Sequence, residues 1–142
     1  MSKYLVDTNV LSEAMKSSPQ PAVSAWLGEQ RANCFLSVIV VAELEYGIEL
    51  LSSGRKKAGL AKAFQTFVNV SAERILAFDM AVARRWAVLR AQWQRRGQPL
   101  PVLDSMIEAT ALHWGLTIVT RNTGDFVEAP TLNPWTGARG TL

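Results

Sequence analysis

Short apolar runs alternate along the chain with longer stretches in which apolar residues recur every three or four positions. The short runs predict strands at residues 3–6, 33–37, 74–78 and 116–119. The helical spacing predicts helices at residues 10–15, 22–30, 38–51, 55–68, 80–96 and 102–114. Strands that alternate with helices in this way favour an α/β fold, with a mainly parallel central sheet flanked by helices.

Length and composition are those of one ordinary globular domain. The chain has 142 residues, and 49% of them are hydrophobic, which argues against a disordered protein. We therefore expect a single domain over residues 1–142, with an ordered core at about residues 3–135. Residues 133–135 should anchor the end of this core, and a frayed tail is expected from Gly137.

Charge, cysteine content and hydropathy bear on the partners and the cellular location of the protein. The net charge of +3 is compatible with a polyanionic partner but does not establish one. The single cysteine, Cys34, permits no internal disulfide and lies in an apolar run, which favours a buried structural thiol. No secretion signal is apparent, and no apolar stretch approaches the roughly 20 residues of a membrane helix. We expect a cytoplasmic protein without a membrane partner.

Polar residues follow the first and the last of these strands. Asp7 comes directly after the first, and residues 120–126 form a polar turn after the last. Because parallel strands place their carboxyl ends on one edge of a sheet, these two groups should meet there. Asp7 can also simply cap the helix that follows it, and this alternative stays open.

Two more carboxylates can reach the same edge. Glu43 lies at the border of the apolar face of its helix, one turn before Gly47, where a half-buried acid needs a partner. Asp104 lies near the start of the helix that precedes the last strand. Glu108, one turn later, is expected to be more exposed, and the two acids should repel unless a cation or hydrogen bonds intervene.

Converging carboxylates without a nearby lysine or arginine favour a hard divalent cation. The all-oxygen ligand set selects Mg²⁺ (or Mn²⁺) over zinc, since the chain has one histidine and one cysteine, far apart in sequence. Such a site usually serves phosphoryl chemistry.

The helix at residues 80–96 carries five arginines together with Trp86 and Trp93. The arginines can hold phosphates and the tryptophans can stack on bases. Alternatively, the tryptophans belong to the core and the arginines form a solvated rim. His113, near a helix end beside Gly115, is expected to serve the helix terminus and not catalysis.

Five stretches together resemble the PIN-domain ribonuclease toxins of the VapC type, and within them the FitB group. The matching stretches are residues 5–13, 36–44 with Gly47, 104–111, 120–126 and 133–135. The resemblance covers nearly the whole chain and implies the PIN-like three-layer fold. It implies the toxin of a type II toxin–antitoxin system, a metal-dependent endoribonuclease that hydrolyses RNA phosphodiesters and leaves 5′-phosphate and 3′-hydroxyl ends. A cognate antitoxin protein, a homodimer and operator DNA bound through the antitoxin complex are also implied.

The resemblance assigns the first three acids of the family to Asp7, Glu43 and Asp104, as catalytic residues and metal ligands. The fourth family position falls on Asn122, whose amide can ligate but carries no charge. Asp125 can supply that charge instead, so the fourth ligand stays open between the two.

Further residues surround this set. Asn9, Ser37 and Thr120 match polar positions that line the pocket of the family, behind the ligands. Basic residues at the rim, among them Arg85 and Arg121, are expected to hold the RNA backbone.

Two other functions compete with this interpretation. A phosphatase or phosphotransfer domain also clusters acids at strand ends, but Asp7 is followed by Thr8-Asn9 and not by an Asp-x-Asp motif. A catalytically weak PIN-fold binding module, acting through an antitoxin with DNA or through RNA, is kept open by Asn122.

Overall fold

The computed structural model describes residues 2–140 and contains a six-stranded sheet at its centre. The spatial order of the strands is β3-β2-β1-β4-β5-β6. Their bounds are β1 (Tyr4–Val6), β2 (Cys34–Ser37), β3 (Ile75–Leu76), β4 (Thr117–Val119), β5 (Thr131–Leu132) and β6 (Arg139–Gly140). All neighbouring pairs are parallel except β5 and β6, which are antiparallel. The predicted mainly parallel sheet is confirmed.

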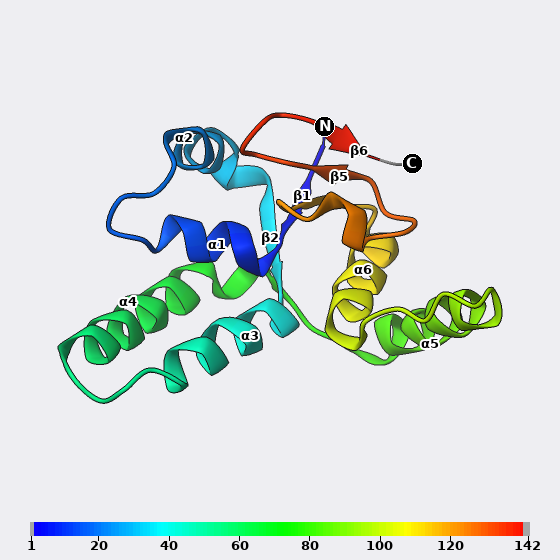
Figure 1. Cartoon of the computed structure of the whole chain (residues 1–142), viewed down its shortest axis with the longest axis horizontal. Coiled ribbons are helices and arrows are strands. Elements are labelled where there is room, and N and C mark those ends of the chain that lie inside the picture. Colours follow the sequence, from blue (N-terminus) through cyan, green and yellow to red (C-terminus); the bar gives the residue numbers. More distant parts are fainter. Residues whose placement is uncertain (1, 141–142) are drawn as a thin grey trace.

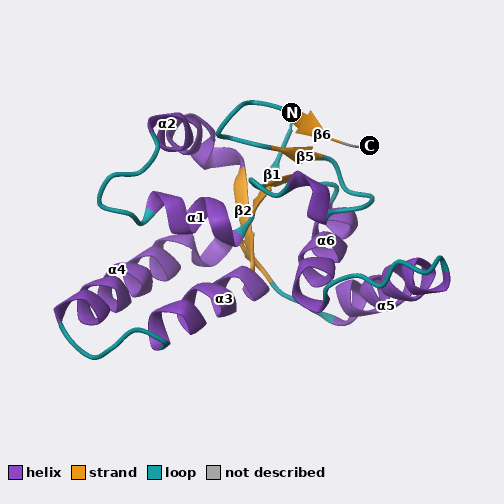
Figure 2. Ribbon diagram, viewed as in Figure 1, coloured by secondary structure: helices purple, strands orange, loops and turns teal. Residues whose placement is uncertain are grey.

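Helices lie on both sides of this sheet, as Figures 1 and 2 show. Their bounds are α1 (Thr8–Ala14), α2 (Pro21–Gln30), α3 (Val38–Glu49), α4 (Arg55–Ser71), α5 (Met80–Arg95) and α6 (Val102–Trp114). Helices α1 to α4 connect β1, β2 and β3 on one side, whereas α5 and α6 lead from β3 to β4 on the other (Figure 1). The result is the three-layer arrangement that the resemblance implied.

The strand order reverses between β1 and β4. From β1 the chain proceeds outward to β2 and β3, and it then returns across the sheet to place β4 on the opposite side of β1. In open parallel sheets the carboxyl ends of two such strands flank a crevice where ligands bind. The two polar groups that follow β1 and β4 therefore occupy the expected place for a functional site.

A continuous apolar core holds these two strands rigid. Leu5, Val6, Ile118 and Val119 are each no more than 1% exposed. The helices contribute apolar residues to the same cluster from both sides, including Val10, Val40 and Ile107. Burying the sheet on both faces fixes where its strand ends point, because packed interiors leave little room to shift.

The carboxyl end of the chain corrects one expectation. Residues 139 and 140 are not frayed, since they form β6 and pair with β5. Gly137, at a φ of 80°, permits the turn between them, and Asn133 N–H donates to the Ala138 carbonyl at 2.8 Å. Residues 141 and 142 of the predicted tail lie outside the described residues. Among the described residues, no helix is both long and apolar enough to cross a membrane.

Candidate active site

Asp7 lies where β1 ends and is also the N-cap of α1. Its Oδ1 accepts a hydrogen bond from the Thr8 N–H at 2.8 Å. Its Oδ2 accepts from the Thr120 hydroxyl at 2.8 Å and from the Asn9 amide at 3.2 Å. The carboxylate is 6% exposed. The two interpretations of Asp7, as a helix cap and as a site residue, are therefore compatible.

Hydrogen bonds join the ends of β1 and β4 around this carboxylate. The Asn9 side-chain amide donates to the Thr120 hydroxyl oxygen at 3.1 Å, and the Asn9 side-chain oxygen Oδ1 accepts from the Arg121 backbone N–H at 3.0 Å. Thr120 also accepts from the Asn122 N–H at 3.1 Å. Asn9 and Thr120 thus contact Asp7 and hold it in one orientation, while their place in a catalytic pocket stays a prediction.

Ser37 and Glu43 belong to the segment that leaves β2. The Ser37 hydroxyl caps α3 by accepting from the Ile39 N–H at 3.0 Å. Glu43 is half-buried on α3, as predicted, and its Oε1 accepts a hydrogen bond from the Thr8 hydroxyl at 2.7 Å. Ser37 therefore acts on the helix that carries Glu43, while Thr8, which the sequence did not single out, contacts the acid itself.

Asp104 lies in the first turn of α6 and faces the other acids. Burial, together with the charges of Asp7, Asp125 and Glu43, raises its pKa to about 6. The pKa of Asp7 is also raised, mainly by burial and further by the charge of Asp125, although its hydrogen bonds oppose this change. The acids therefore lie close enough to repel one another.

The turn after β4 carries both candidates for the fourth position. Asp125 ends a short 3₁₀ turn (Thr123–Asp125), and its charge raises the pKa of both Asp7 and Asp104. Asn122 is exposed, and within the described residues its side chain makes no hydrogen bond to the acids. Asp125 thus acts on the acids through its charge, and the identity of the fourth ligand stays a prediction.

Glu108 corrects a second expectation. It is 1% exposed, not solvated. Its carboxylate accepts from the N–H groups of Val127, Glu128 and Ala129 at 2.6 to 3.1 Å. The sequence predicted that Asp104 and Glu108 repel unless a cation or hydrogen bonds intervene. Backbone hydrogen bonds to the buried Glu108 carboxylate are present. Glu108 anchors the segment that follows Asp125 to the helix that carries Asp104.

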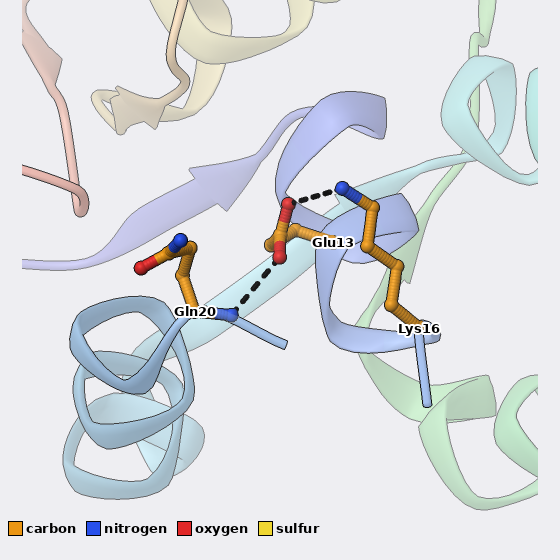
Figure 3. A network of polar contacts seen from close by, with 3 residues as sticks. All are labelled: Glu13, Lys16 and Gln20. Atoms are coloured by element: carbon orange, nitrogen blue, oxygen red, sulfur yellow. Dashed lines mark hydrogen bonds and ion pairs between the residues drawn. The ribbon is translucent and has the colours of Figure 1, made fainter. Parts of the chain in front are cut away.

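Glu13 is a third buried acid, and sequence reasoning assigned it no role beyond its place in a matching stretch. It is 5% exposed and accepts from the Lys16 ammonium and the Gln20 N–H, each at 2.9 Å (Figure 3). The hydrogen bond from Lys16, followed by that from Gln20, lowers its pKa, and the charge of Arg121 acts in the same direction. Glu13 closes the connection between α1 and α2. The sequence did carry a signal for this contact, because Glu13 lies on the apolar face of its helix three residues before a lysine.

The two arginines expected to contact RNA lie in different places. Arg121 follows Thr120 at the site, is exposed, and stacks on Trp135 at 4.6 Å. Arg85 lines a groove of about 500 Å³ with His113. Trp86, the next residue on α5, donates its indole N–H to Ser105, which follows Asp104 on α6. The Arg121 backbone lies at the site, where its N–H donates to the Asn9 side chain, and RNA contacts by both arginines stay predictions.

The tryptophans of α5 serve the fold. The Trp86 indole donates to Ser105 at 2.9 Å, and the Trp93 indole donates to Glu128 at 2.7 Å. Both rings are partly buried, but neither packs against the apolar core cluster of the described residues, so the core interpretation is not confirmed. Cys34 is partly buried, and this burial raises the pKa of its thiol to about 11, which disfavours the reactive thiolate at neutral pH.

The donor set fits a hard divalent cation. Asp7, Glu43, Asp104 and Asp125 offer only oxygen, and within residues 2–140 none of the four takes part in an ion pair. In the same part of the chain, no three acid, histidine or cysteine side chains already stand in the arrangement of a metal site. Mutual repulsion separates carboxylates when no cation lies between them, and a cation would relieve the raised pKa of Asp104.

Comparisons with known proteins agree with this arrangement. A sequence model of the PIN domain matches residues 4–131. The chain belongs to the PIN-domain family. This PIN domain is 40% identical to Toxin FitB of Neisseria gonorrhoeae over 92% of its own length and 97% of the relative. It is 36% identical to the VapC ribonuclease Y4jK of Sinorhizobium fredii, over 92% and 96% of the two chains.

The solved structures give the same answer. The structure of FitAB bound to an IR36 DNA fragment superposes with a TM-score of 0.86 and 38% identity, over 93% of this chain and 95% of the other. The family and the PIN-like fold expected from the sequence are confirmed, and the chain is a homologue of the FitB and VapC toxins.

Proposed function

We propose that this PIN domain is the toxin of a type II toxin–antitoxin system and cuts RNA as a metal-dependent endoribonuclease. One observation carries the proposal: burial and the charges of Asp7, Asp125 and Glu43 raise the pKa of Asp104, and no cationic side chain pairs with any of these four acids among the described residues. The relatives named toxin and VapC ribonuclease support the same conclusion.

Asp7, Glu43, Asp104 and Asp125 would hold Mg²⁺ or Mn²⁺. When bound, such an ion lowers the pKa of water and neutralises charge on a phosphodiester. Thr120 and Asn9 keep the Asp7 carboxylate oriented toward the cluster through the two hydrogen bonds to Oδ2. Asp125 is exposed, and its carboxylate supplies the fourth negative charge, which the neutral Asn122 amide cannot provide.

The proposed substrate is an RNA strand that crosses the edge of the sheet. Arg121 follows Thr120 in the chain, and its exposed guanidinium stacks on Trp135, from where we expect it to pair with a phosphate beside the cut. Arg85 stays a prediction for another phosphate of the strand. The cognate antitoxin, the homodimer and an operator DNA bound through the antitoxin complex are proposed from the family, and the FitAB–DNA structure supports the last of these.

The test mixes the purified, antitoxin-free chain with total RNA in Mn²⁺, in Mg²⁺ and in EDTA. The wild type and Asp79→Asn should give discrete fragments with either metal and none in EDTA, whereas Asp7→Asn should give none in any lane. Asp79 is the matched control because it is also an N-cap acid, on α5, and its side chain accepts from the Val82 N–H.

Intact RNA in every lane, from a chain shown to be folded, would overturn the nuclease proposal. It would favour a PIN-fold module that binds an antitoxin or RNA without cutting it.

A further inference from the structure

Thr8 contacts two of the four acids at once. Its N–H donates to Asp7 Oδ1 at 2.8 Å, and its hydroxyl donates to Glu43 Oε1 at 2.7 Å. Asp7 ends β1, while Glu43 lies 35 residues later on α3. A single residue at the start of α1 thus ties together acids from two separate parts of the fold.

The hydroxyl contact is what orients the Glu43 carboxylate. In the part of the chain that the structure describes, no other hydrogen bond and no ion pair reaches this carboxylate. A half-buried glutamate has several rotatable bonds and loses rotamer freedom whenever it is held in one position. The Thr8 bond engages Oε1 and leaves Oε2 available for a cation.

We propose that Thr8 is a positioning residue that presents Glu43 to the divalent cation. The inference rests on the proposed function, since it assumes a cation among the four carboxylates. Groups that hydrogen-bond to metal ligands typically change metal affinity by 10-fold to 100-fold when they are removed, because the ligand must then be ordered during binding. The backbone N–H to Asp7 survives any substitution at residue 8 except proline, so a side-chain change isolates the effect on Glu43.

The experiment measures Mn²⁺ affinity of the full chain by titration calorimetry at neutral pH. Thr8→Val has nearly the same shape but lacks the hydroxyl, and we expect about a 10-fold weaker affinity. Thr8→Ser keeps the hydroxyl and should bind within about threefold of the wild type. Thr66→Val is the matched control, because the Thr66 hydroxyl donates only to a carbonyl of its own helix, that of Lys62. It should bind Mn²⁺ like the wild type.

A double-mutant cycle separates positioning from a general structural effect. In a Glu43→Ala background, Thr8→Val should weaken Mn²⁺ binding no further, because the group that Thr8 orients is gone. In the wild-type background, raising the Mn²⁺ concentration should restore RNA cleavage by Thr8→Val. If Thr8→Val does not fold, Thr8→Ala takes its place with the same expectations.

Three results would overturn the inference: wild-type affinity in Thr8→Val, equal loss in Thr8→Ser and Thr8→Val, or an undiminished effect of Thr8→Val without Glu43. Its failure differs from failure of the proposed function. If Glu43→Ala weakens Mn²⁺ binding and Thr8→Val does not, only the role of Thr8 is wrong. If the wild type binds no Mn²⁺, both the proposed metal site and the proposed role of Thr8 are wrong.

Discussion

Replacing Asp104 with asparagine should stabilise the metal-free protein. The pKa of this carboxyl is raised from 3.8 to about 6 by burial and by neighbouring acids. A raised pKa means that the folded state holds the proton more tightly than the unfolded chain does. The free energy of unfolding therefore falls as the pH rises from 3.8 toward 6, and above pH 6 the charged carboxylate imposes its full cost.

The size of this cost follows from the two pKa values. The difference between 3.8 and about 6 corresponds to about 3 kcal/mol at 1.36 kcal/mol per pH unit. Asp104 is only partly buried, and solvent screening reduces the value to about 1–2 kcal/mol. Asp104→Asn removes the charge and should raise the free energy of unfolding in EDTA by that amount at pH 7.5.

Urea unfolding followed by tryptophan fluorescence measures this change. The gain should shrink as the pH is lowered from 7.5 to 4.5, since Asp104 then becomes neutral in the wild type. Glu45 is an exposed acid on the outer side of α3, and Glu45→Gln should leave the free energy of unfolding unchanged. Saturating Mn²⁺ should make the wild type more stable than Asp104→Asn. A ligand at 100 times its Kd stabilises a protein by about 2.7 kcal/mol, and the variant should bind Mn²⁺ poorly. An Asp104→Asn chain that is less stable than the wild type in EDTA at pH 7.5 would refute the reasoning.

Three more predictions follow from the buried groups. Glu108→Gln should lower the free energy of unfolding by about 2–3 kcal/mol in urea titrations, because three backbone N–H groups lose a charged acceptor; an unchanged midpoint would mean that water replaces it. Glu13→Ala should speed hydrogen exchange of the Gln20 amide and lower the urea midpoint, and equal exchange rates would remove Glu13 from the α1–α2 connection. Cys34 should react with a thiol reagent at pH 8 much more slowly in the folded chain than in urea, because its pKa is raised to about 11; equal rates would show an accessible thiolate.

Much of the fold was readable from the sequence because its main elements carry strong periodic signals. Leu5-Val6 and Ile118-Val119 are buried on both faces of the sheet, and such strands appear as apolar runs. Strands β5 and β6 were missed since each has two residues, which is too short to show a period.

The site was predicted to the extent that it depends on strand ends and helix faces. Asp7, Glu43 and Asp104 follow from such positions, and the structure brings their charges together. The burial of Glu108 was not predictable, because its hydrogen-bond partners lie 19 to 21 residues away in a loop without periodicity. The choice between Asn122 and Asp125 likewise depends on a single 3₁₀ turn.

The most direct test of the central claim examines the ends that cleavage produces. A short RNA that the protein cuts is resynthesised with one 2′-deoxy sugar on the 5′ side of the cut and is incubated with the chain in Mn²⁺. If the acid cluster directs water at the phosphodiester, the modified strand is still cut and leaves 5′-phosphate and 3′-hydroxyl ends. Loss of cleavage at the modified position, with 2′,3′-cyclic phosphate ends on the unmodified RNA, would show attack by the sugar hydroxyl and would contradict the account.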